Sequence, residues 1–171
     1  MSKQPKVAVI MGSESDLPVM QSATEVLKAF GVAFEMRALS AHRSPDATHD
    51  FARNAERQGF SVVIAGAGGA AHLAGVVASL TTLPVIGVPM PTERMGGMDS
   101  LLSTVQMPKG VPVATMGIGK SGAANAALLA VQILALSDEE LGKKFRAYKS
   151  RMAASVGDAD ARVKETRTIS E

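Results

Sequence analysis

The chain has 171 residues, of which 46% are hydrophobic and 20% are charged, and its formal net charge is +2. This length and composition predict a single domain with one sizeable core, and the nearly balanced charge excludes a basic surface for nucleic acid. The chain has no cysteine, which excludes a disulfide framework, a thiolate nucleophile and a thiolate metal site.

Two stretches bear on the protein's location. Residues 1–6 lead into a short apolar segment without the longer apolar run and cleavage site of a signal peptide, so the sequence predicts a cytoplasmic protein. Residues 58–92 contain no Asp, Glu, Lys or Arg and are long enough to span a membrane. Glycines and prolines interrupt this stretch, so a buried αβ unit fits better and no membrane contact is expected.

Apolar periodicity and the positions of Gly and Pro predict strands that alternate with helices. In chain order, strands are expected at residues 6–11, 32–39, 60–65, 85–88 and 111–118, and helices at about 19–30, 45–58, 70–80, 99–105 and 123–136. This alternation predicts a three-layer αβα fold of the α/β class, with a doubly wound parallel sheet. In such a sheet, ligands bind beyond the carboxyl ends of the strands.

One further helix is expected after this core. A capping box, with Ser137 as the cap and Glu140 three residues on, predicts that it begins near 138 and runs to about 155. We therefore predict one domain over 1–171, with a core at about 6–136, the C-terminal helix, and a polar, fraying tail at 156–171. A narrow apolar stripe on this helix favours docking onto its own domain or onto a neighbouring subunit; the stripe consists of Leu141, Phe145, Tyr148 and Met152.

The turn after the second predicted strand combines a titratable ring, a cation and two hydroxyl groups. It reads Ser40-Ala41-His42-Arg43-Ser44-Pro45. Ser44 can cap the next helix and Pro45 suits its first position, so backbone N–H groups and Arg43 favour an anion such as phosphate here. Taken alone, the motif is more typical of a polar loop with an incidental histidine.

The loop after the first predicted strand reads Gly12-Ser13-Glu14-Ser15-Asp16. Its N–H groups and the Ser13 hydroxyl could cradle a phosphate, but it is not a P-loop, because the second glycine and the Lys-Ser/Thr pair are absent. Asp16 could accept a hydrogen bond from a ribose hydroxyl or serve only as a helix cap.

The loop after the third predicted strand reads Gly66-Ala67-Gly68-Gly69-Ala70-Ala71-His72. It fits the dinucleotide pattern G-x-G-x-x-A, but no acidic residue ends the next strand, so we reject NAD binding and assign the glycines to close approach of the backbone to a small ligand. His72 is either structural or in contact with substrate. Neither His42 nor His72 has zinc-ligand spacing, so no metal is expected.

Together these three motifs closely resemble those of the N5-carboxyaminoimidazole ribonucleotide mutases of bacterial purine biosynthesis, the family of the bacterial class I phosphoribosylaminoimidazole carboxylase catalytic subunit. Further matching stretches are Asp99-Ser100-Leu101, Val105-Gln106-Met107-Pro108 and residues 122–129. The resemblance covers roughly residues 6–150.

The resemblance implies a flavodoxin-like αβα subunit in a symmetric homo-octamer, with active sites at subunit contacts and no cofactor. It implies that His42 is the acid/base that moves a carboxyl group from the exocyclic nitrogen of a small-molecule ribonucleotide to ring carbon 4. The substrate-binding residues that it implies are Gly12, Ser13, Asp16, Ser40, Ala41, Arg43, Gly68, Gly69, Ala70, His72 and Leu73.

The sequence departs from the family pattern in two places. Ser44 stands where Thr is usual, and Ala74 stands where Pro is usual, which is expected to loosen the glycine-rich loop slightly. Related carboxylases that take CO2 directly usually have Lys after the histidine and lack the Ala-Ala-His loop, so Arg43 and His72 favour the mutase. A direct carboxylase and a non-catalytic nucleotide-binding sensor are the alternatives.

Overall fold

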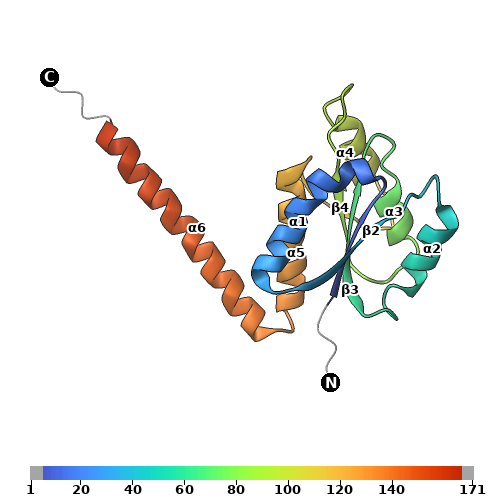
Figure 1. Ribbon diagram of the computed structural model, residues 1–171, viewed down its shortest axis with the longest axis horizontal. Coiled ribbons are helices and arrows are strands. Elements are labelled where there is room, and N and C mark those ends of the chain that lie inside the picture. The colour runs from blue at the N-terminus through green and yellow to red at the C-terminus, as the bar shows by residue number, and fades with distance from the viewer. Residues whose placement is uncertain (1–5, 167–171) are drawn as a thin grey trace.

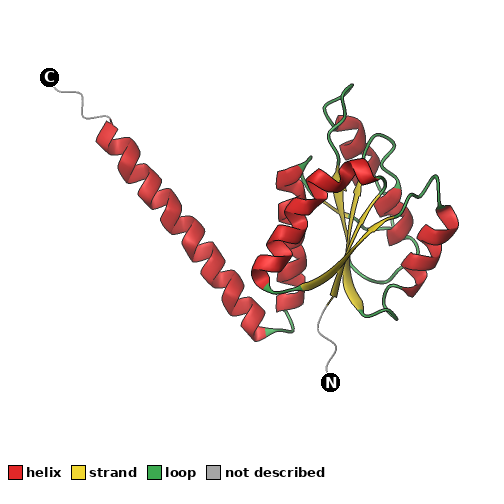
Figure 2. Ribbon diagram, in the orientation of Figure 1, coloured by secondary structure: helices red, strands yellow, loops and turns green. Residues whose placement is uncertain are grey.

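The computed structural model describes residues 6–166, in which five parallel strands form one sheet. Figure 2 shows the strands as the central layer, with helices on both sides. The strands are β1 (Lys6–Met11), β2 (Ala33–Ala38), β3 (Phe60–Ala67), β4 (Val85–Pro89) and β5 (Ala114–Thr115). Their order across the sheet is β2-β1-β3-β4-β5, which confirms the predicted three-layer, doubly wound fold and its flavodoxin-like order.

Helices connect successive strands and continue past the last one. They are the 3-10 helix η1 (Glu14–Asp16), α1 (Leu17–Phe30), α2 (Pro45–Asn54), α3 (Leu73–Ala78), α4 (Met98–Val105), α5 (Lys120–Ala135) and α6 (Glu139–Thr166). Helices α1 and α5 cover one face of the sheet, and α2 and α3 cover the other (Figure 1). Within this described part of the chain, no helix is long and apolar enough to cross a membrane.

The interior strand β1 is buried on both faces from Val7 to Met11. Val7, Val9 and Met11 pack into the core beneath α1 and α5, whereas Ala8 and Ile10 pack into the core beneath α2 and α3. A strand covered on both sides needs apolar residues along its buried length, so residues Val7 to Met11 form a continuous apolar run rather than an alternating one. This burial fixes the register of β1, because a slip would bring mismatched side chains into both cores.

The carboxyl ends of β1, β2 and β3 lie level with one another. Met11 pairs with Ala38 of β2 and with Gly66 of β3. The backbone bonds continue beyond β1, because Gly12 donates to the Gly66 carbonyl at 3.0 Å and Leu39 donates to the Met11 carbonyl at 2.8 Å. The loops that follow these strands therefore start from one line at one rim of the sheet.

Several elements differ from the sequence prediction in length. Helix α2 ends at Asn54 instead of 58. β5 pairs with β4 over two residues only, instead of the expected 111–118. It is an edge strand, and Pro112 just before it lacks the N–H that ladder pairing needs. β3 extends to Ala67 and α3 begins only at Leu73, so the segment 70–72 is a turn rather than the first turn of a helix.

The C-terminal helix α6 is longer than predicted. It continues to Thr166 instead of ending near 155, so most of the expected tail is helical, and residues 167–171 lie outside the described residues. The predicted cap is also wrong by one residue. Leu141 donates its N–H to the Asp138 carboxylate at 2.9 Å, whereas the Ser137 hydroxyl donates back to the Leu134 carbonyl at 3.3 Å.

Only the first turns of α6 dock onto the rest of the domain. Leu141 is buried, and the rings of Phe145 and Tyr148 lie 5.9 and 5.6 Å from that of Phe30 in α1. Beyond this contact the helix extends away from the sheet and its covering helices (Figure 1), and Met152 is 47% exposed. The apolar stripe is thus covered by its own domain at one end and uncovered at the other.

Candidate active site

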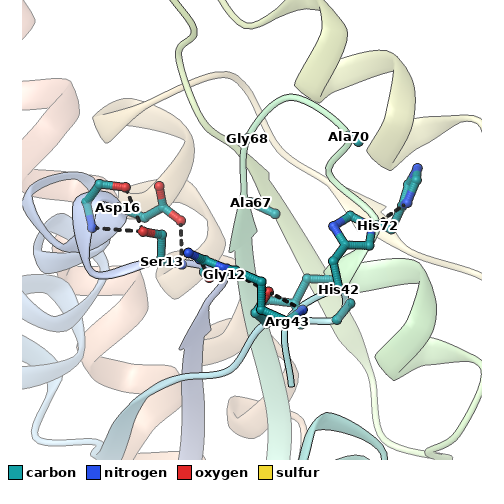
Figure 3. A pocket seen from close by; sticks show the side chains of 13 residues that line it. Gly12, Ser13, Asp16, His42, Arg43, Ala67, Gly68, Ala70 and His72 are labelled. Carbon is teal, nitrogen blue, oxygen red and sulfur yellow. Dashed lines mark hydrogen bonds between the residues drawn. The ribbon is translucent and has the colours of Figure 1, made fainter. Parts of the chain in front are cut away.

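A cavity of about 390 Å³ opens at the carboxyl ends of β1, β2 and β3 (Figure 3). Its walls come from the three loops that follow these strands, and the lining residues are Gly12, Ser13, Ser15, Asp16, Ser40, Ala41, His42, Arg43, Ala67, Gly68, Ala70, His72 and Leu73. The volume lies within the range typical of small-molecule sites. In a sheet of this order, the connection after β1 runs to one side and the connection after β3 runs to the other. Ligands bind in the crevice that forms between two such connections.

Every residue singled out from the sequence lines this cavity except Gly69. Gly69 instead donates its N–H to the Ser100 hydroxyl at 2.9 Å, which directs this group towards α4. Ser15 and Ala67 line the cavity without having been selected. Ser15 belongs to the loop that the sequence predicts to bind phosphate, so this motif points to it as well. Ala67 lies at the end of β3, where the sequence predicts a turn.

The conformation of the loop after β1 is fixed by a capping box at the start of η1. Ser13 donates its N–H to the Asp16 carboxylate at 3.1 Å, and its side-chain oxygen accepts from the Ser15 hydroxyl at 2.9 Å and from the Ser15 N–H at 3.4 Å. Because the Ser13 oxygen accepts both bonds, its own O–H is available to a ligand. The proposed roles of Asp16 as cap and as cavity residue are therefore compatible.

Asp16 is a partly buried carboxylate in this loop. Burial raises the pKa of its carboxyl group above the ordinary value of 3.8, while hydrogen bonds from Ser13 and Ser15 and the charge of Arg43 oppose the shift. A partly desolvated carboxylate binds a hydroxyl donor more strongly than one in open water. Asp16 is therefore suited to accept from a sugar hydroxyl.

The β2 loop forms a closed turn from Ser40 to Ser44. The Ser40 side-chain oxygen accepts from the Arg43 N–H at 3.1 Å and from Arg43 Nε at 3.4 Å. Ser44 precedes Pro45 as expected of a cap, but its hydroxyl bonds to the Ser40 backbone instead of capping α2. The turn is thus fixed by its own serines.

Arg43 links this turn to the β1 loop. Its Nη2 donates to the Gly12 carbonyl at 2.8 Å. A guanidinium has five N–H donors in a planar fork, and the bonds through Nε and Nη2 leave the others available to an anion. Helix α2 begins directly after this turn, at Pro45, so the positive end of its dipole lies beside Arg43. This side of the cavity is suited to a phosphate.

His42 and His72 face each other across the other side of the cavity. His42 Nε2 lies 2.9 Å from His72 Nδ1, and the two rings meet nearly edge to face, with centroids 4.9 Å apart. A hydrogen bond between two imidazoles holds one proton between the nitrogens, so the protonation states of the two rings are linked. The pair can therefore deliver or accept a proton at the edge of the cavity.

The β3 loop places small groups beside the histidine pair. Gly69 has a φ of 66°, and two tight turns follow, in which Ala71 donates to the Gly69 carbonyl and His72 donates to the Ala70 carbonyl, each at 2.9 Å. These turns delay the start of α3 until Leu73. They also present the small groups of Gly68 and Ala70 to the cavity, which leaves room for a small ligand group.

The described residues offer no evident metal centre, since within 6–166 no group of three or more His, Asp or Glu side chains lies close enough to hold a metal ion. What the cavity does offer is an anion-binding side and a proton-transfer side. Fold and site together define a doubly wound α/β protein that binds a small anionic molecule at the carboxyl ends of its strands and can move protons on it.

Comparison with known proteins identifies the family. The model of the AIR carboxylase family matches residues 6–155. Three similar proteins are N5-carboxyaminoimidazole ribonucleotide mutases: that of Pyrococcus abyssi is 57% identical over 86% of this chain and 84% of its own, that of Saccharolobus solfataricus is 57% identical over 89% and 95%, and that of Mycobacterium leprae is 55% identical over 98% and 96%. The crystal structure of Treponema denticola PurE matches with a TM-score of 0.85 at 28% identity, covering 94% of this chain and 99% of that one. The chain belongs to the AIR carboxylase family.

Proposed function

We propose that this protein is an isomerase that converts N5-carboxyaminoimidazole ribonucleotide to 4-carboxy-5-aminoimidazole ribonucleotide in de novo purine (IMP) biosynthesis. One observation carries the proposal. A single cavity combines the anion-binding turn at Arg43 with the hydrogen-bonded pair His42 and His72, which is the combination that acid/base chemistry on a ribonucleotide needs. Relatives that carry the mutase name, at 50% identity and above, support it.

The cavity suggests how the ribonucleotide is held. Its phosphate binds the Ser13 hydroxyl and the Arg43 guanidinium, beside the start of α2. Asp16 accepts a hydrogen bond from the ribose, and Ser40 assists by holding Arg43 in place. The imidazole then extends towards His42, and the loop from Gly68 to Leu73 surrounds the transferred carboxyl group.

The reaction needs one proton delivered and one removed. A protonated His42 gives its proton to the exocyclic nitrogen, the carbamate C–N bond breaks, and CO2 leaves with the amine restored. Ring carbon 4 then attacks CO2 to form the new C–C bond, and His42 takes the proton that carbon 4 loses. Protons and electrons balance without an added reactant, so one histidine that first donates a proton and then accepts one can serve both steps. The small groups of Gly68 and Ala70 leave space for CO2 between the steps.

Substrate preference separates this function from a direct carboxylase and from a non-catalytic sensor. Purified protein is supplied with N5-carboxyaminoimidazole ribonucleotide, or with aminoimidazole ribonucleotide and bicarbonate, and the product is followed by its absorbance. We expect rapid conversion of the first substrate, and conversion of the second only at very high bicarbonate. The reverse preference would indicate a carboxylase, and tight binding without turnover would indicate a sensor.

His42 is expected to carry the proton transfers. His42→Asn keeps a polar side chain of similar reach at an exposed position, so the fold and ligand binding should survive. Turnover should fall by at least the roughly 10²- to 10⁴-fold contributed by a positioned acid/base. Steady-state kinetics give the loss, and calorimetric titration with the product gives the binding.

Two further variants separate the roles within the site. Arg43→Ala should mainly weaken binding, because its contacts with the phosphate exist in the ground state and in the transition state alike. His72→Asn should retain more activity than His42→Asn, since His72 acts through His42 or through contact with the carboxyl group. Near-normal kcat in His42→Asn together with an inactive His72→Asn would reverse the two assignments.

We further propose that the protein is a homo-octamer in the cytoplasm. Helix α6 has 28 residues and is about 42 Å long, and its apolar stripe continues beyond the domain through Val156 and Val163, which are 68% and 60% exposed. Such a stripe left in water is unfavourable, so other subunits are expected to cover it. The phosphorylated substrate does not cross membranes freely, which favours the cytoplasm; recovery of the enzyme in a membrane or exported fraction of cells would contradict this.

The octamer can be tested by substituting Val156, which is exposed in the isolated subunit. Light scattering at micromolar concentration should give eight times the subunit mass for the wild-type protein. Val156→Asp should lower this mass with the helical content unchanged, because the side chain touches no core in the subunit. Ala154→Asp, on the opposite side of the same exposed turns, is the matched control and should keep the wild-type mass. A wild-type monomer would refute the assembly.

A further inference from the structure

Gly69 is held by two serines of α4. Its N–H donates to the Ser100 hydroxyl at 2.9 Å, and its carbonyl accepts from the Ser103 hydroxyl at 3.1 Å. Both polar groups of one loop residue are thus bonded to one helix, on the side that faces away from the cavity. Nothing in the proposed chemistry accounts for these serines, which line no part of the cavity.

Helix α4 is itself fixed to the sheet. Ser100 is fully buried, and the Thr104 hydroxyl donates to its carbonyl at 2.8 Å. The Thr104 methyl group packs against Gly87 of β4, where a Cβ atom would leave it no room. At its other end, α4 is tied to the preceding loop, because Thr92 donates to the Asp99 carboxylate at 2.7 Å. The Ser100 hydroxyl therefore has a defined position relative to the strands.

The two serine contacts differ in strength. The Ser103 hydroxyl has one proton and lies near two carbonyls, that of Asp99 at 2.7 Å and that of Gly69 at 3.1 Å, so it shares that proton. The Gly69 carbonyl also accepts from the Ala71 N–H at 2.9 Å. The Gly69 N–H has Ser100 as its partner within the described chain, so Ser100 is the main restraint and Ser103 a supporting one.

The restrained residue sits at the centre of the cavity loop. Gly68 and Ala70, on either side of Gly69, line the cavity, and the same loop leads to His72 and its bond with His42 (Figure 3). Gly69 adopts a φ of 66° although no atom lies within 4 Å of the place a Cβ atom would occupy. That side of Gly69 is open, and its N–H and carbonyl bonds with α4 are contacts that restrain this conformation.

We propose that Ser100 and Ser103 are positioning residues, which act through Gly69 to hold the Gly68–Ala70 wall and His72 at the distance from His42 that carboxyl transfer needs. The kinetic part of this inference rests on the proposed function. Misplacing reacting groups by as little as 1 Å can cost about 10²-fold in rate, so a restraint outside the cavity can control turnover within it. The phosphate side, built by the β1 and β2 loops, does not depend on α4.

The restraint is tested first by amide hydrogen exchange, which does not require the proposed reaction. Ser100→Ala should speed exchange of the Gly69 amide by roughly 10-fold, because it removes the acceptor of that N–H. Ser79→Ala is the control, since its hydroxyl is also bonded to the backbone, donating to the Val76 carbonyl, but lies outside the cavity loop. An unchanged Gly69 exchange rate in Ser100→Ala would overturn the proposal.

Kinetics then test the consequence for the reaction. Ser100→Ala and Ser103→Ala should each lower kcat for N5-carboxyaminoimidazole ribonucleotide by roughly 2- to 12-fold, the range expected for one hydrogen bond, and the double variant should lose more than either. The Kd for aminoimidazole ribonucleotide, which lacks the carboxyl group, should stay within about 2-fold of wild type because its phosphate contacts are intact. Ser103→Thr keeps the hydroxyl and should restore kcat.

Each outcome decides a separate question. Wild-type kcat in both single variants and in the double variant would overturn the positioning role and leave the mutase function intact. Equal losses in kcat and in aminoimidazole ribonucleotide binding would also overturn the positioning role, because they would indicate general loosening of the fold. A wild-type protein that does not convert N5-carboxyaminoimidazole ribonucleotide would refute the proposed function, and the exchange experiment would still decide whether the serines hold Gly69.

Discussion

The site depends on the pairing of β1 with β2 along one edge and with β3 along the other. All three strands run parallel and end level, so Met11 lies opposite both Ala38 and Gly66. β1 is buried on both faces, which makes a slip of register costly and fixes this line of strand ends. The loops that supply most of the cavity residues therefore start from a rigid base, although the loops themselves are irregular.

The β2 loop spans the cavity, and its neighbouring residues serve different purposes. β2 lies at the edge of the sheet, yet its loop reaches Gly12 after β1 through Arg43 and reaches His72 after β3 through His42. Its serine bonds make this possible, because Ser40 holds the arginine by both its backbone N–H and its Nε. One short turn thus holds the anion-binding Arg43 and the proton-transferring His42 at a fixed separation. A general acid/base requires such positioning.

Much of this arrangement could be predicted from the sequence, because alternating strands and helices require parallel strands, and motifs that follow parallel strands must share a rim. The contact between His42 and His72 could not be predicted, since it joins residues 30 apart and depends on loop shape. Gly69 was assigned to the cavity because a glycine pattern does not reveal which side of a loop faces the ligand. The cap of α6 was missed because Ser137 and Asp138 are both good caps, and the local turn decides between them.

The most direct test of the account is a crystal structure of the protein with 4-carboxy-5-aminoimidazole ribonucleotide bound. The phosphate is expected on Ser13 and Arg43, and the new carboxyl group is expected against the loop at Gly68 and Ala70. The exocyclic nitrogen or ring carbon 4 is expected within about 2.6–3.2 Å of a His42 nitrogen, or one water away. A ligand with its phosphate at the histidine pair, or bound outside this cavity, would contradict the account.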